Sequence, residues 1–308
     1  CRAAAGWPAT VHLWARGTPL TPAKPVCRAQ SGDALLMLGA AGDGADRVGI
    51  ISRAIDYSNL ETLIVRPDGS VEPTGIPQRR SMMAFASGGS WITTQLSEDA
   101  TINGKTVKAE SIIAYDVRKS TPADKRINTV VPASGSDFLS GFQGLSAGKT
   151  TVRLAMDNRG IKRIDTATCR DGRWVVSRGT PAPVGTDIAF SAADPTSDAA
   201  ILQRTGYLLP TRLELVNAGG PAKTLFSEKP MFDASRFIVE IKTARSKDGT
   251  EIDYYLLRPR VAARPGETPT LMTGYGAFSI SFTPGYLDAI VGGRSLVPWL
   301  TRGGALAL

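Results

Sequence analysis

The sequence predicts a mainly β fold built from antiparallel hairpins, followed by the beginning of a parallel α/β unit. Three observations lead to this prediction. The chain holds 32 Gly and 20 Pro among 308 residues, together about a sixth of the total and above the usual share of about 12%. Turn dipeptides separate short apolar runs, and no segment up to residue 233 shows helical periodicity over a helical length. Only the last part of the chain changes to a strand, helix and strand pattern.

Hairpin signals occur at several places in the first part of the chain. Asp68-Gly69, Asn103-Gly104 and Asp171-Gly172 each lie between two short runs of strand-forming residues. Such dipeptides supply the positive φ angles that two-residue hairpin turns require. They predict antiparallel pairing of the strands on either side.

The number of hairpins favours a propeller over a sandwich. A sandwich seldom needs 230 residues, whereas one propeller blade takes about 40–50 residues. Residues 10–233 would then form about four or five blades, although no blade signature recurs along the sequence. We therefore assign residues 1–233 to part of a β-propeller.

Residues 234–308 have a different pattern. Phe237 to Ile241 alternates with period two, and the chain turns at Lys247–Thr250 before a second strand. Thr270–Thr273 is a short apolar strand, Ser295–Arg302 has helical patterning that ends at two glycines, and Ala305–Leu308 begins another buried strand. Strand, helix and strand in this order predict the start of a parallel α/β sheet.

Composition disfavours several classes of function. The chain carries 36 Lys and Arg against 28 Asp and Glu, a net charge of +8. The cations are scattered, whereas nucleic-acid binding needs them clustered beside aromatic side chains. No run approaches the ~20 apolar residues of a membrane-spanning helix. We expect neither nucleic acid nor a membrane as a partner.

Metal and cofactor chemistry has no support in the residues. His12 is the only histidine, and Cys1, Cys27 and Cys169 lie far apart without a zinc-binding spacing. His12 falls in an alternating strand, where we expect an ordinary half-exposed side chain. No cofactor is expected.

Gly144–Gly148 matches the G-x-S-x-G pattern of a nucleophile elbow around Ser146. An elbow needs a buried strand before the serine, a helix after it and a histidine to take the proton. Here Thr151–Ala155 has strand patterning, and His12 is the only possible base. We expect a turn between two blade strands. Gly148-Lys149-Thr150 does not form a phosphate loop, because the first glycine is one residue out of register.

The segment Gly274–Phe278 follows the strand at 270–273 and carries Tyr275 between two glycines. A phenol at the carboxyl end of a sheet strand can project into a cleft and donate a hydrogen bond to a developing oxyanion. Spacing alone favours the simpler interpretation, a turn in which Tyr275 and Phe278 cover the core.

An ordered set of motifs resembles the prolyl oligopeptidase family of serine peptidases. The specific part of the resemblance covers about the last 75 residues, and the first 230 fit more loosely. Leu13–Leu20 resembles a propeller strand ending in Gly-Thr. The later motifs are Phe232–Ser235, Ser246–Ile252, Pro269–Phe278, Ser281–Pro284 and Trp299–Leu308.

The resemblance implies a seven-bladed propeller joined to an α/β-hydrolase domain, which would begin at residue 234. It implies cleavage of short peptides after proline by a Ser-His-Asp mechanism, with the propeller restricting access to the site. Tyr275 would help form the oxyanion hole, and Phe278 would line the substrate pocket. Ala277 stands where many members of the family carry a second glycine, a small change that should leave the loop intact.

The resemblance implies that the triad lies beyond Leu308 and the early blades before Cys1, and both ends of the given sequence look like cuts. The chain alone should therefore be inactive. The alternatives are a stand-alone propeller that binds a partner, or a related oligopeptidase that prefers basic residues. Localisation stays open between cytoplasm and periplasm, and the sequence does not indicate the oligomeric state.

Overall fold

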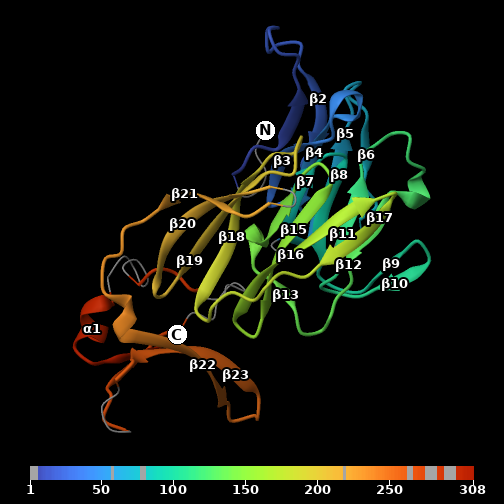
Figure 1. Cartoon of the computed structure of the whole chain (residues 1–308). Helices are drawn as coiled ribbons and strands as arrows, with labels where there is room; N and C mark the ends of the chain where they lie inside the picture. The colour runs from blue at the N-terminus through green and yellow to red at the C-terminus, as the bar shows by residue number, and fades with distance from the viewer. Residues whose placement is uncertain are drawn as a thin grey trace.

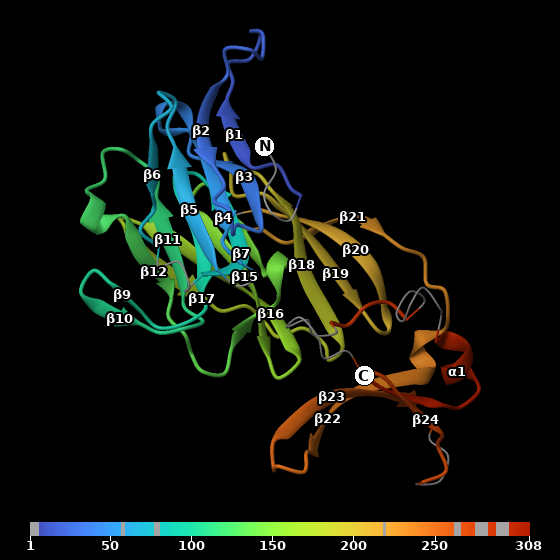
Figure 2. The ribbon, with the colours of Figure 1, turned by 180° about the vertical axis from the view of Figure 1, so that it is seen from behind.

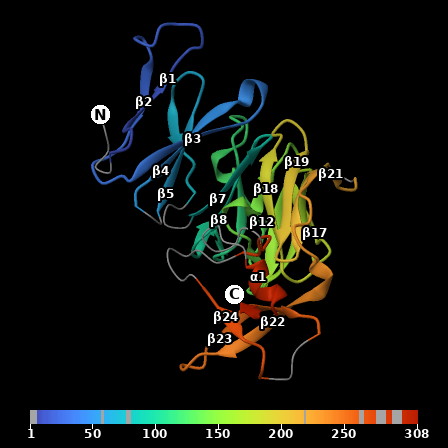
Figure 3. The same cartoon turned by 90° about the vertical axis from the view of Figure 1, so that its left-hand side faces the viewer.

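A computed structural model describes residues 6–56, 59–76, 81–217, 220–261, 266–274, 283–287 and 296–308. The chain begins with an antiparallel hairpin of β1 (Thr10–Leu13) and β2 (Lys24–Arg28). This hairpin lies at the opposite end of the molecule from the C-terminal strands in all three views (Figure 1, Figure 2 and Figure 3). None of the helices in the described residues is long and apolar enough to cross a membrane.

Two antiparallel sheets follow, and each is a simple meander. The first sheet contains β3 (Leu35–Ala41), β4 (Val48–Ala54), β5 (Leu60–Val65) and β6 (Val71–Pro73). The second contains β7 (Ser81–Gly88), β8 (Trp91–Leu96), β11 (Ile112–Asp116) and β12 (Ile127–Val131). A separate hairpin, β9 (Ala100–Ile102) with β10 (Lys105–Val107), is inserted between β8 and β11.

The third and fourth sheets continue the series. The third contains β13 (Phe138–Leu139), β14 (Leu145–Ala147), β15 (Thr151–Asn158), β16 (Ile161–Arg170) and β17 (Arg173–Ser177). The fourth contains β18 (Thr186–Ala193), β19 (Ala200–Gly206), β20 (Leu209–Val216) and β21 (Lys223–Ser227). Short 3-10 helices lie at Gly44–Asp46, Ala123–Lys125, Phe142–Gly144 and Ala234–Arg236. The prediction of a mainly β chain is confirmed.

The predicted turns have the expected backbone geometry. Gly69 has a φ of 82°, Asn103 and Gly104 have φ angles of 53° and 72°, and Asp171 and Gly172 have 51° and 73°. Each of these turns joins two antiparallel strands. The hairpins therefore form where the sequence supplies residues that tolerate positive φ.

Successive sheets pack face to face with one apolar layer between each pair, as the blades of a propeller do. Successive side chains of β11 point to opposite faces of its sheet, so this one strand contributes to two apolar layers. Ile113 and Tyr115 belong to the core shared with the first sheet, whereas Ile112 and Ala114 belong to the core shared with the third. A further apolar cluster, which includes Ala155, Ile188 and Leu202, joins the third and fourth sheets.

Hydrogen bonds also join the third sheet, at the start of β15, to the turn between β18 and β19 of the fourth sheet. The Lys149 N–H donates to the Ser197 carbonyl at 2.7 Å, and the Asp198 carboxylate accepts hydrogen bonds from Thr150 and Thr151.

The second and third sheets approach closely at Gly88 of β7. A Cβ atom on Gly88 would lie 2.3 Å from the Ala147 carbonyl oxygen. Glycine is therefore required for the close approach of the second and third sheets.

The C-terminal sheet has the order β22-β23-β25-β24. Its strands are β22 (Phe237–Arg245), β23 (Glu251–Pro259), β24 (Thr270–Met272) and β25 (Ala305–Ala307), and helix α1 (Val297–Thr301) lies between β24 and β25 in the chain. The strands β24 and β25 pair in parallel, as the strand, helix and strand pattern predicts. Gly303, with a φ of 91°, follows the end of α1.

The structure differs from the prediction at Gly144–Gly148. Leu145–Ala147 is a short strand, β14, and not a turn. The reason is alternation: Leu145 and Ala147 both enter the apolar core between the second and third sheets, so this segment pairs with β15 through Ser146 and Arg153.

Candidate functional site

The carboxyl end of β24 leads directly to the segment that carries the two predicted site residues. Thr273 extends the parallel pairing, since its N–H donates to the Ala307 carbonyl at 3.0 Å. Gly274 follows and is the last described residue before the segment. Tyr275 and Phe278 themselves lie outside the described residues.

The chain is described again from Thr283, and the residues that follow are well packed. The ring of Tyr286 stacks on Phe232 with 5.3 Å between ring centroids, and its hydroxyl accepts a 2.8 Å hydrogen bond from the Met231 N–H. Leu287 is fully buried in the core of the C-terminal sheet. The segment with Tyr275 therefore connects the end of β24 to residues fixed near the last strands.

Tyr255 shows which part of the molecule lies next to the carboxyl ends of β24 and β25. Its backbone N–H and carbonyl both bond to Leu308, at 2.9 Å each, so Tyr255 lies at the carboxyl end of the parallel pair. Its hydroxyl donates a 2.7 Å hydrogen bond to the Gly160 carbonyl, in the turn between β15 and β16. The carboxyl edge of the C-terminal sheet is therefore in contact with the third sheet.

A cavity of about 250 Å³ lies at this contact. Its lining combines residues of the third sheet with residues of the C-terminal sheet and with the first residues after the segment of Tyr275. The lining residues are Asp157, Arg159, Gly160, Lys162, Ile241, Asp253, Tyr254, Tyr255, Thr283 and Pro284. The flank that follows the predicted site, at Thr283 and Pro284, thus lines a cavity between two sheets.

A charged cluster surrounds the buried Lys162 side chain beside this cavity. The ammonium group of Lys162 donates to the Asp157 carboxylate and, at 2.9 Å, to the Ser140 hydroxyl. The Lys162 Nζ atom also lies 3.7 Å from Oδ1 of Asp187, an oxygen that is buried and makes no hydrogen bond. Burial raises the pKa of Asp187, and the neighbouring lysine partly offsets this effect.

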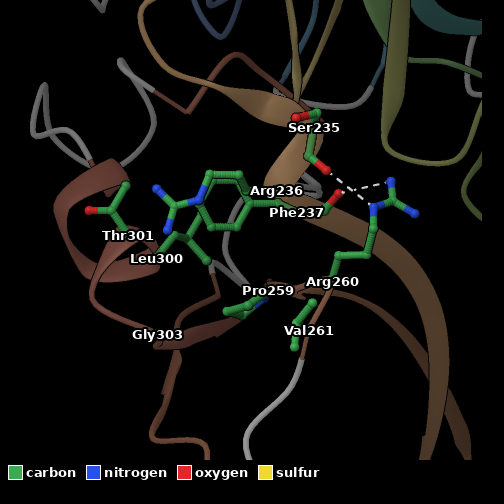
Figure 4. A pocket seen from close by; sticks show the side chains of 9 residues that line it. All are labelled: Ser235, Arg236, Phe237, Pro259, Arg260, Val261, Leu300, Thr301 and Gly303. Atoms are coloured by element: carbon green, nitrogen blue, oxygen red, sulfur yellow. Dashed lines mark hydrogen bonds between the residues drawn. The ribbon is translucent and has the colours of Figure 1, made fainter.

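A larger cavity of about 490 Å³ lies at the other edge of the C-terminal sheet (Figure 4). It is bounded by the start of β22, the end of β23 and the end of α1. Arg260 donates to the Ser235 carbonyl at 3.1 Å, and the guanidinium of Arg236 lies 6.0 Å from the centroid of the Phe237 ring. This cavity is at the amino end of β25, since Gly303 lines it, so it is remote from the carboxyl end of β24.

The other serine and histidine candidates have no catalytic geometry. Ser146 is buried in β14, and its hydroxyl makes no hydrogen bond. His12 is an exposed residue of β1. Cys27 and Cys169 are half-buried free thiols, and burial raises the pKa of each. Within the described ranges, no three His, Cys, Asp or Glu side chains gather in a way that could hold a metal ion.

Sequence reasoning missed the residues that join the two parts of the site. Asp157 and Lys162 flank a hairpin turn, Asp187 is the second residue of β18, and Tyr255 lies in β23. They meet because the third, fourth and C-terminal sheets pack together, and no spacing along the chain indicates this. Gly160, with a φ of 84°, lies in the tight turn between Asp157 and Lys162, but a glycine after an arginine is a weak turn signal in the sequence.

The sequence matches no protein-family model. It is 26% identical over 299 residues to an uncharacterized peptidase of Sinorhizobium fredii, covering 95% of this chain and 40% of that protein. It is 23% identical to an uncharacterized peptidase of Rickettsia prowazekii, covering 69% of this chain and 29% of that protein. The chain thus spans less than half the length of the curated relatives that it matches.

Solved structures show the same fold. A post-proline cleaving enzyme from Rickettsia typhi matches with a TM-score of 0.76 and 18% identity, over 100% of this chain and 44% of that one. Oligopeptidase B from Trypanosoma brucei matches with a TM-score of 0.76 and 16% identity, over 99% and 42%. A structure titled for two prolyl endopeptidases gives 0.73 and 16%, over 97% and 41%. The resemblance to the prolyl oligopeptidase family is confirmed at the level of the fold, including its propeller.

Proposed function

We propose that this chain is the central part of a serine oligopeptidase of the prolyl oligopeptidase type, and that the whole protein cleaves short peptides after proline. The observation that carries the proposal is the fold. Blade-like sheets followed by a strand, helix and parallel strand match structures of this peptidase type over nearly all of the chain. The curated relatives, which are named as peptidases, support the same assignment.

The proposal divides the chain into two parts. Residues 1–233 are part of a propeller, and residues 234–308 begin an α/β-hydrolase domain. The second assignment is supported by the parallel pairing of β24 with β25 and by the presence of helix α1 in the connection between them. In open α/β sheets, ligands bind at the carboxyl ends of the strands.

The reaction assigned to this edge is acyl transfer through a serine that lies outside these 308 residues. The serine oxygen attacks the scissile carbonyl while a histidine takes the hydroxyl proton and later delivers it to the leaving amine. Tyr275 donates a hydrogen bond to the oxyanion together with a backbone N–H, and Phe278 lines the pocket for the substrate side chain. Residues of this chain thus stabilise the oxyanion and bind the substrate side chain, whereas the nucleophile comes from another part of the protein.

The position of the third sheet supports a gating role for the propeller. Gly160 and Tyr255 are in direct contact, so one side of the carboxyl edge is covered. A substrate can reach this edge only through the remaining openings, which favours short peptides over folded proteins.

Preference for a basic residue is the nearest alternative, because oligopeptidase B matches with the same TM-score as the post-proline cleaving enzyme. The test compares fluorogenic peptides that end in proline or arginine as substrates of the whole protein. We expect the proline substrate to have the higher kcat/KM. A higher value for the arginine substrate would reassign the specificity, and hydrolysis of neither would support a binding module.

A further inference from the structure

A cavity of about 420 Å³ lies at the end of the propeller sheets that is remote from the C-terminal sheet. Residues of all four sheets line it, among them Lys149 just before β15 and Pro195 in the turn between β18 and β19. The eight residues of β15 span about 25 Å, and they separate this cavity from the turn at Gly160. The cavity is therefore distinct from the candidate site, and its volume is typical of small-molecule sites.

Backbone hydrogen bonds fix the turns that form the wall of this cavity. The Gly42 N–H donates to the Gly89 carbonyl at 2.9 Å, and the Gly89 N–H donates to the Pro195 carbonyl at 2.7 Å. A Cβ atom on Gly89 would lie 2.4 Å from the Lys149 carbonyl oxygen, so the turns of the second and third sheets are in contact. The cavity is formed before any ligand binds, which lowers the entropy cost of binding.

The second and third sheets supply positive charge to the cavity. The Arg118 guanidinium binds the Asp116 carboxylate through Nε and Nη2, and it lies 5.8 Å from the centroid of the Trp91 ring. Among the described residues, neither Nη1 of Arg118 nor the ammonium group of Lys149 has a hydrogen-bond partner. Two cationic donors are therefore available to a carboxylate.

The first sheet supplies negative charge to the same cavity. Asp43 accepts a 2.7 Å hydrogen bond from the Gly44 N–H, whereas the Asp46 carboxylate has no partner in the part of the chain that the structure describes. The hydrogen bonds with Asp116 raise the pKa of the Arg118 guanidinium, and the charge of Asp46 adds to this rise without a direct ion pair. Opposite charges thus line one cavity and do not neutralise each other.

We propose that this cavity binds a small zwitterion, either a free amino acid or a short peptide. The ligand carboxylate pairs with Arg118 and Lys149, and its ammonium group pairs with Asp46. Trp91 and Pro195 provide apolar surface for the ligand side chain. Like charges repel an anion without an ammonium group and a cation without a carboxylate, so the cavity selects molecules that carry both charges. The site is independent of the peptidase assignment.

The test measures binding of alanyl-leucine to the whole protein by equilibrium dialysis. This dipeptide contains neither proline nor a basic residue, so neither specificity considered above would cleave it. N-acetylation removes its ammonium charge, and C-terminal amidation removes its carboxylate charge. We expect each capped form to bind about tenfold more weakly than the free dipeptide, the effect of losing one charged hydrogen bond. Binding of free leucine as tightly as the dipeptide would identify amino acids as the ligand, and weaker binding would identify peptides; both results support the site.

Two substitutions locate the binding in this cavity. Asp46→Asn should weaken binding of the free dipeptide to the same degree and leave the N-acetylated form unchanged, because that form has no ammonium group. Lys149→Gln should weaken the free dipeptide and leave the amidated form unchanged. Asp124→Asn and Lys125→Gln change the same residue types in an exposed 3-10 helix outside the cavity, and they should bind like the unaltered protein.

Two results would overturn the proposal. One is the absence of binding of the free dipeptide at millimolar concentrations. The other is binding that neither Asp46→Asn nor Lys149→Gln weakens, which would assign the dipeptide to another part of the protein.

Discussion

The hydroxyl group of Tyr255 donates a hydrogen bond to the carbonyl oxygen of Gly160 across the boundary between two sheets, with 2.7 Å between the oxygen atoms. This bond places the carboxyl edge of the C-terminal sheet against a hairpin turn of the third sheet. Burial raises the pKa of the Tyr255 phenol, so the hydroxyl remains a neutral donor over the physiological pH range. Both residues line the cavity between the two sheets.

Gly160→Ala should destabilise the chain more than an ordinary turn substitution. A Cβ atom there would lie 2.8 Å from the Tyr255 hydroxyl oxygen, and the φ of Gly160 is 84°. Positive φ costs an alanine about 1–2 kcal/mol, and a displaced hydrogen bond adds about 1 kcal/mol.

Gly172→Ala is the matched control, because Gly172 has a φ of 73° in a similar turn with no atom within 4 Å of the added Cβ. Urea unfolding of the two variants separates the cost of the positive φ, which both share, from the cost of the lost contact with Tyr255, which only Gly160→Ala has. Equal losses of stability in both would show that the contact with Tyr255 adds nothing.

Asp137 should make the stability of the third sheet depend on pH. Hydrogen bonds from Arg163 and Asn158 hold the pKa of this buried carboxyl well below its usual range. A lowered pKa contributes stability that is present above the ordinary value near 4 and is lost as the pH falls toward the folded-state value. The urea midpoint should therefore drop between pH 5 and pH 3.

Asp137→Asn should lower stability at pH 7 by about 2–3 kcal/mol, because Arg163 loses one of its two carboxylate partners. The same variant should show a smaller drop in urea midpoint between pH 5 and pH 3 than the unaltered chain. Asp171→Asn, at an exposed turn position, is the control and should keep the original pH dependence. If Asp137→Asn kept the full drop in urea midpoint between pH 5 and pH 3, that drop would arise from carboxyl groups other than Asp137.

Tyr275→Phe should lower kcat of the whole protein by about 10²-fold and leave KM nearly unchanged, as expected when one oxyanion-hole donor is lost. Tyr115→Phe is the control, since Tyr115 is a tyrosine of β11 in the core between the first and second sheets. Steady-state kinetics on a fluorogenic Gly-Pro peptide measure both variants. An unchanged kcat in Tyr275→Phe would return this residue to a packing role.

Much of the fold could be predicted from the sequence because its signals are local. Asn103-Gly104 and Asp171-Gly172 determine hairpin turns through their own backbone preferences. The turn at Arg159-Gly160 could not be predicted in this way, because arginine rarely adopts the φ of 49° found there. The predicted helix over 295–302 is shorter in the structure, at Val297–Thr301.

The candidate site could be predicted only in part. The segment with Tyr275 stands out because it follows a strand, and the structure describes that strand as β24. The cluster of Lys162 and Asp187 and the entry of Tyr207 into the C-terminal core depend on how separate sheets pack. Such contacts between distant segments leave no periodicity or spacing in the sequence.

The central claim is that this chain is part of a serine peptidase whose nucleophile lies outside these 308 residues. Its most direct test is to label the whole protein with a fluorophosphonate probe and to locate the modified residue by mass spectrometry, with hydrolysis of a Gly-Pro substrate followed in parallel. We predict labelling of one serine outside this chain, with complete loss of hydrolysis. Absence of labelling and hydrolysis, or labelling of Ser146, would contradict the claim.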